Sequence, residues 1–504
     1  MTQRYRRRRL AFVSALALVL PLAVTGHALA DPTNNTPAKL TKAVTLNSVL
    51  RHLDALQSIS NTHGDRAAGR PGFRASVDYV VGRLNAAGYA PTVQPFDFTY
   101  VEDNSVLDVL APIFTSYRRD LDFTYTDFVP RAEGDVTGAL QAVDLVLPPT
   151  PTPSSTSGCD AADFAGFVPG KIALIQRGTC NFTIKVANAQ AAGAVAVVLF
   201  NEGQPGRTGL VIPIGDATGL TIPVVSATFD VGNQLAALPS PTVRVKVDVT
   251  TETRTAWNVL AESQYGDTNN VVMAGAHLDS VQNGPGINDN GSGTAALLET
   301  AIQMSKVRTN AKVRFAWWGA EESGLLGSDH YVGALTQAER DRIALYLNFD
   351  MVGSPNYFYG IYDGDDSSHT APVAIPPGSA QIEDVFEKFY ADRGLPSEDT
   401  EFSGRSDYGP FIAVNIPAGG LFTGAEGVKT AGQAARYGGT AGVAFDSCYH
   451  QPCDNRSNLN LTALDVNADA IATAVITFAF DTSTVNGVRA PGKSHGRPPR
   501  GVLS

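Results

Sequence analysis

The sequence predicts an α/β fold, with a largely parallel central sheet flanked by helices and a β-rich domain inserted into it. Three short apolar runs, 271–276, 313–318 and 344–349, are bounded by glycine or polar residues and are typical of buried strands. Strands that alternate with helices form a parallel sheet covered on both faces. Around residues 116–250 the pattern changes to short β-type runs separated by turns. At 504 residues and 43% hydrophobic content, the chain is long enough for two domains.

The first part of the main domain is expected over residues 31–115. Apolar residues at helical spacing predict helices over 45–59 and 73–87, and a strand is expected over 92–100. Residues 31–42 are polar and predict an irregular segment. We expect the two helices to pack on the sheet that is formed later in the chain.

The inserted domain is expected over 116–250 and consists mainly of strands. The sequence predicts strands over 139–147, 171–176, 194–200 and 243–249, and one helix over 184–192. Residues 148–158 are rich in Pro, Ser and Thr and predict a surface loop. This region places no cluster of acids and histidines at strand ends, so we interpret it as a separate domain.

The main domain resumes over 251–484, with further helices expected over 291–306, 381–393 and 463–480. After the first 30 residues, no stretch is expected to be long and apolar enough to span a bilayer. The tail, 485–504, is rich in Gly and Pro, carries only positive charge, and predicts disorder.

The N-terminus has the three parts of a secretion signal. Arg4 and Arg6–Arg9 form a basic segment, residues 10–24 are apolar, and Ala28-Leu29-Ala30 is a small-residue cleavage pattern. A membrane anchor is the alternative, but the apolar run is short and contains Pro21. We therefore expect a secreted protein, with residues 1–30 removed by cleavage after Ala30.

Charge argues against several classes of partner. The leader contains five arginines and no acid, so its removal moves the formal net charge from −11 to −16. An acidic surface disfavours nucleic acids and anionic membranes, and we expect neither as a partner. We expect the mature chain to be a monomer.

The four cysteines all follow the leader, as two local pairs: Cys159 with Cys180, and Cys448 with Cys453. Two disulfides are favoured in an exported protein. A cysteine zinc site is the alternative, but the wide spacing of Cys159 and Cys180 does not complete its pattern.

Acidic residues and histidines follow the predicted strands and predict a metal site. In an open α/β sheet, ligands bind beyond the carboxyl ends of the strands. A hydrolytic zinc site needs nitrogen and oxygen ligands and a position left for water. Five candidates are His277, Asp289, Glu322, Asp350 and His450. They exceed what one catalytic zinc uses and suggest a pair of ions, although any one of them alone is more often a cap or an ordinary polar residue.

Neighbouring residues suggest supporting roles. Glu321 adjoins Glu322, and if one binds metal, the other is held nearby as a general base; a solvated acidic turn is the alternative. Asp279 lies two residues after His277 and can hold its imidazole in the metal-binding tautomer. Tyr449 can donate a hydrogen bond to an oxyanion, or it can be a packing aromatic in a disulfide loop.

Five separated motifs resemble the secreted di-zinc aminopeptidases, which include bacterial leucine aminopeptidases and yeast aminopeptidase Y and are more distantly related to the glutamate carboxypeptidases. The motifs are His277-Leu278-Asp279-Ser280, Asn288-Asp289-Asn290-Gly291-Ser292-Gly293, Gly319-Ala320-Glu321-Glu322, Asn348-Phe349-Asp350-Met351 and Cys448-Tyr449-His450. They occur in the family's order and span nearly the whole catalytic region. The resemblance implies an α/β fold with a central, largely parallel sheet flanked by helices.

The resemblance also implies a role for each position. Asp289 would bridge two zinc ions, with His277 and Asp350 on one ion and Glu322 and His450 on the other. Glu321 would be the general base, Asp279 would orient His277, and Tyr449 would polarise the scissile carbonyl. A cis peptide bond is expected between Asp289 and Asn290. Calcium is a second candidate ion.

The inserted region resembles a protease-associated domain. It carries Gly170-Lys171-Ile172-Ala173-Leu174-Ile175-Gln176-Arg177-Gly178-Thr179-Cys180-Asn181-Phe182, followed by an alanine-rich helix that Gly193 closes. Such domains are β-rich inserts placed over or beside the active site of secreted peptidases. Two loops, at 403–408 and 416–423, resemble family loops that line the cleft. In them Arg405 can meet a carboxylate and Phe422 an apolar side chain, or both can be ordinary surface residues.

The resulting expectation is a secreted zinc aminopeptidase that removes N-terminal residues, apolar ones such as leucine first, from peptides or proteins with a free N-terminus. A carboxypeptidase or dipeptidase on the same scaffold is the alternative. The large carboxypeptidases of the family carry a helical domain after the last ligand, whereas only residues 451–504 follow His450 here. An inactive binding protein is a second alternative, which the filled ligand positions disfavour.

Overall fold

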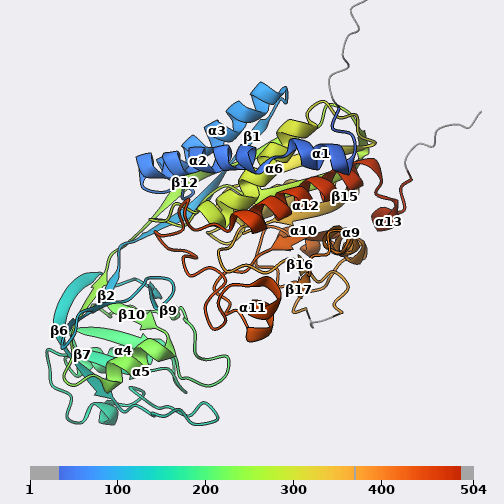
Figure 1. Ribbon diagram of the computed structural model, residues 1–504. Coiled ribbons are helices and arrows are strands. Elements are labelled where there is room, and N and C mark those ends of the chain that lie inside the picture. The colour runs from blue at the N-terminus through green and yellow to red at the C-terminus, as the bar shows by residue number, and fades with distance from the viewer. Residues whose placement is uncertain (1–32, 368–370, 490–504) are drawn as a thin grey trace, which may run out of the picture.

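The computed structural model describes residues 33–367 and 371–489. The predicted leader, 1–30, and most of the tail, from residue 490, lie outside the described residues. The chain forms two lobes (Figure 1), a larger one in which helices cover a sheet and a smaller one built mainly of strands. The predicted α/β fold with a β-rich insert is confirmed.

The larger lobe contains an eight-stranded sheet in the order β1-β12-β14-β13-β15-β18-β16-β17. Its strands are β1 (Thr92–Asp103), β12 (Val249–Glu262), β13 (Asp267–His277), β14 (Ala311–Trp318), β15 (Ile343–Phe349), β16 (Gly360–Tyr362), β17 (Glu398–Thr400) and β18 (Ala418–Phe422). The central strands β14, β13, β15 and β18 are parallel. Antiparallel pairs join β1 to β12, β12 to β14 and β16 to β18, so the sheet is parallel at its centre and mixed towards its edges.

Helices cover both faces of this sheet because their apolar faces need burial. The helices of this lobe are α1 (Pro37–Ala43), α2 (Leu46–His63), α3 (Pro71–Ala87), α6 (Gly293–Met304), α7 (Leu326–Ala334), α8 (Gln337–Arg340), α9 (Ser379–Asp392), α10 (Gly409–Ala413), α11 (Ala431–Tyr437), α12 (Leu461–Phe480) and α13 (Ser483–Asn486). The five predicted helices of this lobe correspond to α2, α3, α6, α9 and α12.

Two expectations about this lobe were wrong. Residues 37–43 form α1 instead of an irregular segment, because Thr36 caps the helix, Pro37 starts it and Leu40 is fully buried. The helix α12 has the length and hydropathy of a membrane span, contrary to the expectation that no such stretch follows the leader. However, 67% of its apolar window is buried, and it packs on α1, α2, α6 and α9, so it is a helix of the core.

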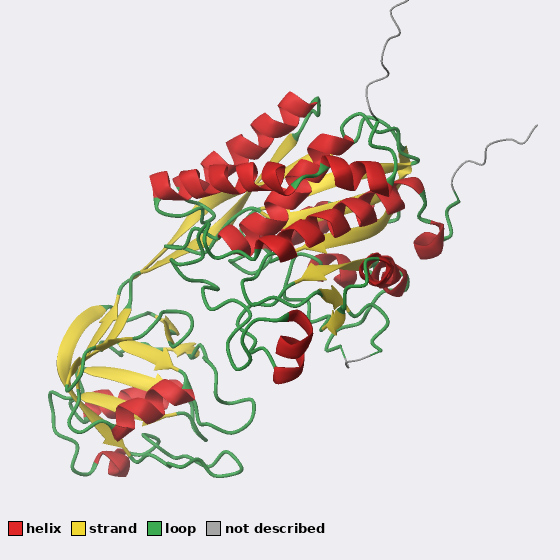
Figure 2. Cartoon of the chain, viewed as in Figure 1, coloured by secondary structure: helices red, strands yellow, loops and turns green. Residues whose placement is uncertain are grey.

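The smaller lobe contains a second eight-stranded sheet in the order β3-β2-β11-β6-β7-β8-β10-β4, with a two-stranded sheet of β5 and β9 beside it. Its strands are β2 (Val106–Ala111), β3 (Thr115–Ser116), β4 (Phe123–Tyr125), β5 (Asp127–Val129), β6 (Gly134–Val143), β7 (Ile172–Gln176), β8 (Ala196–Phe200), β9 (Ile214–Asp216), β10 (Val224–Ala227) and β11 (Thr242–Val247). Figure 2 shows its helices α4 (Phe182–Ala191) and α5 (Phe229–Ala237) packed against the strands. The sheet has its own apolar core.

The boundary of the insert differs from the sequence-based one at its start. Strand β2 belongs to the second sheet, although the boundary at residue 116 would leave it in the main domain. The long antiparallel pair of β1 and β12 leads from the larger lobe to the smaller one (Figure 1). We therefore propose a boundary at Asn104-Ser105, between β1 of the first sheet and β2 of the second. The sequence placed it later because the hydrophobic pattern alone does not show which sheet a strand joins.

Candidate functional site

The predicted ligands that follow strands lie at one edge of the first sheet. His277 is the last residue of β13, Glu322 follows β14, and Asp350 comes directly after β15. The parallel register pairs His277 with Trp318, the last residue of β14, so the strand ends are level. Two further ligand candidates come from loops. Asp289 lies in the turn that precedes α6, and His450 lies in the loop before α12.

Asp289 lies between the two histidines. One of its carboxylate oxygens is 3.2 Å from Nε2 of His277, and the other is 3.2 Å from Nε2 of His450. The residue is 5% exposed, and Asp454 accepts hydrogen bonds from the backbone N–H groups of Asn288 and Asp289. The peptide bond between Asp289 and Asn290 is cis, as the resemblance implied. Each oxygen of one carboxylate therefore faces a different imidazole.

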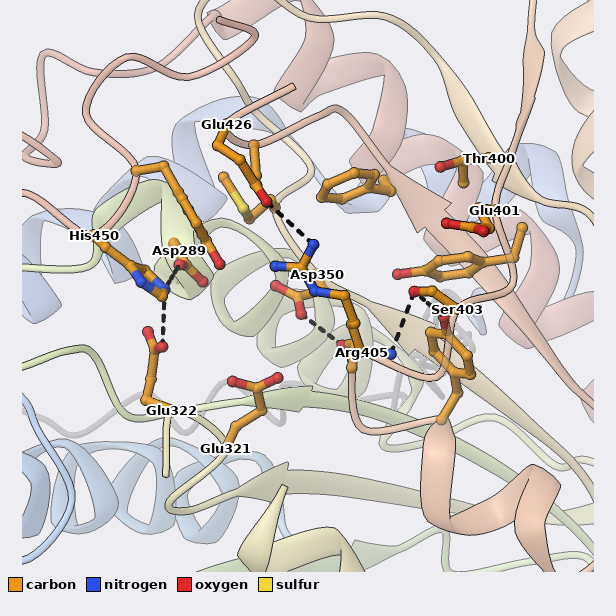
Figure 3. Close-up of a pocket in the computed structure, with 17 residues that line it drawn as sticks. Asp289, Glu321, Glu322, Asp350, Thr400, Glu401, Ser403, Arg405, Glu426 and His450 are labelled. Atoms are coloured by element: carbon orange, nitrogen blue, oxygen red, sulfur yellow. Dashed lines mark hydrogen bonds and ion pairs between the residues drawn. The ribbon is translucent and has the colours of Figure 1, made fainter. Parts of the chain in front are cut away.

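Glu322 and Asp350 complete two groups around Asp289 (Figure 3). An oxygen of Glu322 is 3.0 Å from Nε2 of His450, and an oxygen of Asp350 is 3.4 Å from Nε2 of His277. Oxygen Oε1 of Glu322 is buried and has no hydrogen-bond partner among the described residues. The structure thus brings together all five predicted ligand residues.

Glu321 lies beside these groups. Its nearest oxygen is 3.9 Å from Nε2 of His277. Burial raises the pKa of its carboxyl well above the ordinary value, the nearby charge of His277 opposes this shift, and the charges of Asp350 and other carboxylates add to it. A carboxyl group with a raised pKa is suited to accept and return a proton near neutral pH.

Asp279 supports the site in two ways, one of which was not expected. His277 Nδ1 lies 3.2 Å from the backbone carbonyl of Asp279 and 3.7 Å from its carboxylate. The carboxylate oxygens of Asp279 accept hydrogen bonds from the backbone N–H groups of Glu321 and Glu322, at 3.2 and 3.4 Å. Asp279 therefore links the strand end that carries His277 to the loop that carries both glutamates.

The loop of His450 is closed by a disulfide between Cys448 and Cys453, and the insert contains the other disulfide, Cys159–Cys180. Both predicted pairs are confirmed. The ring of Tyr449 stacks on that of His450, with 3.8 Å between the centroids. Backbone strain accompanies the site, because Ala320, Met351 and His450 all have positive φ. Non-glycine residues in this region are strained and cluster at functional sites.

A cavity of about 180 Å³ opens beside the ligand groups. Arg405 and Phe422, the predicted substrate-binding residues, both line it. Figure 3 shows Arg405 paired with Glu426 of the same chain, at 3.1 Å. The remaining wall includes Tyr362, Thr400, Glu401, Tyr408 and Glu426. It combines aromatic surface with acidic groups.

Arg66 is a supporting residue that sequence reasoning missed. It is fully buried, and its guanidinium donates to the backbone carbonyls of Leu278, Pro285 and Gly286. These carbonyls belong to the loop that joins His277 to Asp289. The only signal in the sequence was an arginine within a turn-rich segment, so the contact could not be inferred.

The site has the chemistry of a binding site for cations. Three carboxylates and two imidazoles converge, and His277, Asp289 and Glu322 offer ligand atoms that all lie within 4.8 Å of one another. Burial of several carboxylates is costly unless positive charge compensates them. Nitrogen and oxygen ligands of this kind suit zinc. The residues present therefore fit a pair of zinc ions.

Comparison with known proteins agrees with this geometry. The sequence pattern of peptidase family M28 matches residues 258–475, and that of the PA domain matches residues 140–235. An aminopeptidase of Pseudomonas aeruginosa is 48% identical over 457 residues, which cover 90% of this chain and 84% of that protein. Leucine aminopeptidase 2 of Trichophyton tonsurans is 40% identical over 475 residues, or 92% of this chain and 91% of that protein.

Solved structures give the same result. An aminopeptidase from Aneurinibacillus sp. strain AM-1 has 28% identity and a TM-score of 0.56, over 87% of this chain and 95% of that chain. BSAP, a zinc aminopeptidase from Bacillus subtilis, has 25% identity and a TM-score of 0.58, over 87% of this chain and 98% of that one.

Proposed function

The chain belongs to peptidase family M28 and is a metallo-aminopeptidase with an inserted PA domain. We propose that it binds two zinc ions and that it prefers peptides with an apolar N-terminal residue such as leucine. One observation supports the two-ion site above all others. The two oxygens of Asp289 each lie 3.2 Å from a different histidine, which is the arrangement that a shared ligand needs. The two disulfides are consistent with an extracellular protein, and we propose secretion with cleavage after Ala30.

The proposed ligands divide into two sets around Asp289. His277 and Asp350 would hold one ion, and Glu322 and His450 the other. When bound, the ions would supply Lewis-acid chemistry, which acidifies a water molecule and polarises a carbonyl group.

The residues of the chain would position the substrate and move the proton. Glu321 would take a proton from the attacking water at a carboxylate oxygen and return it to the leaving nitrogen, as its position beside the ligand groups favours. The hydroxyl of Tyr449 would donate a hydrogen bond to the carbonyl oxygen of the substrate as negative charge develops there. The acidic groups of the cavity wall, Glu401 and Glu426, would face the positive amine of the substrate, and Phe422 its apolar side chain.

The first prediction concerns removal of the metal. Dialysis against a chelator is expected to abolish hydrolysis of Leu-p-nitroanilide, and zinc is expected to restore it with about two ions per chain, measured by elemental analysis. An N-terminally blocked peptide is the matched substrate and should not be cleaved. Cleavage of that peptide from its C-terminus, without nitroaniline release, would indicate a carboxypeptidase, and silence on both substrates with zinc bound would indicate a binding protein.

A second prediction concerns the support of Asp350. Ser406 donates a hydrogen bond to Oδ2 of Asp350 at 2.5 Å and accepts one from the side chain of Asn348. Such contacts orient a metal ligand, and their loss typically costs about 10–100-fold in metal affinity. We expect Ser406→Ala to weaken zinc binding about tenfold in competition titrations with a chromophoric chelator.

The matched control for Ser406→Ala is Ser403→Ala, in the same loop. The hydroxyl of Ser403 lies near that of Tyr408. Its removal is expected to leave zinc affinity unchanged. Equal losses of affinity in both variants would show that the loop as a whole, and not the hydrogen bond to Asp350, determines zinc binding.

A further inference from the structure

A second cavity, of about 480 Å³, lies between the two lobes. Its lining combines the main domain with the insert. Thr99, Val101 and Val281 belong to the larger lobe, whereas Tyr125 and Ile212 belong to the insert. We call this cavity the interlobe groove.

The interlobe groove is continuous with the metal site. Glu322 and His450, the proposed ligands of one ion, line both the groove and the smaller cavity described above. The two cavities therefore meet at this pair of ligands. A peptide bond held for cleavage at the ions would have its N-terminal residue on one side of the pair and the rest of the peptide on the other.

The sizes of the cavities favour one direction. The cavity that contains Phe422, Glu401 and Glu426 has about 180 Å³, and the groove has more than twice that volume, about 480 Å³. An aminopeptidase needs room for one residue on one side of the cleaved bond and room for a longer chain on the other. The smaller cavity, with its acidic and aromatic wall, fits the single N-terminal residue, and the groove fits the chain that follows.

Contacts within the chain fix the walls of the groove. The side chain of Gln282 donates to the backbone carbonyl of Val101 at 2.6 Å and so holds the loop after His277 against β1. Across the lobes, the guanidinium of Arg119 donates to the backbone carbonyl of Asp103. The backbone N–H of Asp127 donates to the carbonyl of Pro213, which places Tyr125 and Ile212 close together.

Ile212 is an apolar residue left open to a ligand. It is 49% exposed and lies two residues before β9, which is on the side of the insert that faces the larger lobe (Figure 1). Tyr125, beside it, is partly buried, and the guanidinium of Arg131 lies 4.6 Å from the centroid of its ring. Together they form an apolar wall in the part of the groove lining that the insert contributes, which also includes the charged residues Arg119 and Asp120.

We propose that the interlobe groove binds the peptide on the carboxyl side of the cleaved bond, and that Tyr125 and Ile212 of the insert contact its side chains. This proposal rests on the proposed aminopeptidase function and adds a role for the insert. The insert would select among longer peptides, because a substrate with a short leaving group ends before it reaches this wall. The chemistry that it recognises is an extended peptide with an apolar side chain at the position that meets Tyr125 and Ile212.

The test exchanges charge between enzyme and substrate. Ile212→Lys and Ile212→Glu are prepared, with hexapeptides that begin with leucine and carry one Glu or one Lys at positions 3, 4, 5 or 6. Each kcat/KM is divided by the value of the same variant for Leu-p-nitroanilide. At one or more positions, we expect Ile212→Lys to favour Glu peptides over Lys peptides by at least about threefold, and Ile212→Glu to show the reverse preference.

Two comparisons make the result specific. Ile184→Lys places the same charge on the insert, at a residue that is 44% exposed and does not line the groove, and should not change the ratios. The preference should also shrink in 1 M salt, where the screening length is about 3 Å, compared with about 30 Å at 0.01 M. A preference in Ile184→Lys as large as in Ile212→Lys would overturn the proposal.

The test separates this proposal from the function on which it rests. If the unchanged enzyme does not hydrolyse Leu-p-nitroanilide, the proposed function fails. If it does, and neither Ile212 variant changes the ratios at any peptide position, the aminopeptidase stands and the assignment of the groove is wrong. Reciprocal preferences in the two variants support the groove assignment, because a purely structural effect would change both in the same direction.

Discussion

Replacing Glu321 by glutamine is expected to lower kcat for Leu-p-nitroanilide by about 10²–10⁴-fold while both zinc ions remain bound. Glutamine has nearly the same shape as glutamate but cannot accept a proton from water. The carboxylate of Glu321 lies beside the ligand groups, 3.9 Å from His277. The measurement is steady-state kinetics together with zinc content.

The adjacent residue provides the control for this variant. Glu322 is 3.0 Å from His450, so Glu322→Gln is expected to weaken zinc binding as well as activity. If Glu321→Gln loses an ion, Glu321 is a ligand and not the base. A fall in kcat of less than about tenfold, with zinc retained, would place the proton transfer on another group.

The main elements of the fold could be predicted because their signals are local. The apolar runs that became β13, β14 and β15 are short, and each is bounded by polar residues or glycine. The long helices α2 and α12 bury apolar residues that recur at helical spacing in the sequence. Short helices such as α1, with seven residues, carry too little periodicity to be recognised.

Long-range pairing could not be predicted from local patterns. Nothing in the short apolar sequence of β2 shows which sheet it joins, and its pairing with β11 and β3 assigns it to the second sheet. The membrane-like composition of α12 is likewise explained by its neighbours, which bury it within the larger lobe. Hydropathy shows that a segment needs burial but not what buries it.

For the candidate site, too, local motifs could be recognised in the sequence but long-range contacts could not. All five ligand candidates come together, because each lies at or shortly after the end of a strand or in a loop with a recognisable motif. Their supports could not be predicted. Arg66 is more than 200 positions from the loop it holds, and Ser406 contacts Asp350 across 56 positions. Such hydrogen bonds exist only once the chain is folded, so no pattern in the sequence announces them.

The ligand with the largest expected effect on metal binding is Asp289. In Asp289→Asn, one carboxylate oxygen is replaced by an NH2 group, which cannot bind a cation. The side chain then has one oxygen left and can no longer serve both ligand sets. Since the loss of a residue that only orients a ligand costs about 10–100-fold in metal affinity, loss of a shared ligand should cost more than about 100-fold for both ions. The dialysed variant is expected to hold close to no zinc and to have no measurable activity on Leu-p-nitroanilide.

Asp350→Asn distinguishes a shared ligand from one that serves a single ion. Asp350 faces His277, at 3.4 Å, so its loss should weaken one site and leave the set of Glu322, His450 and Asp289 in place. We expect about one zinc per chain in Asp350→Asn after dialysis, against close to none in Asp289→Asn, by elemental analysis. If both variants keep one ion, Asp289 serves only one of the sites, and the two ions cannot be held as a bridged pair.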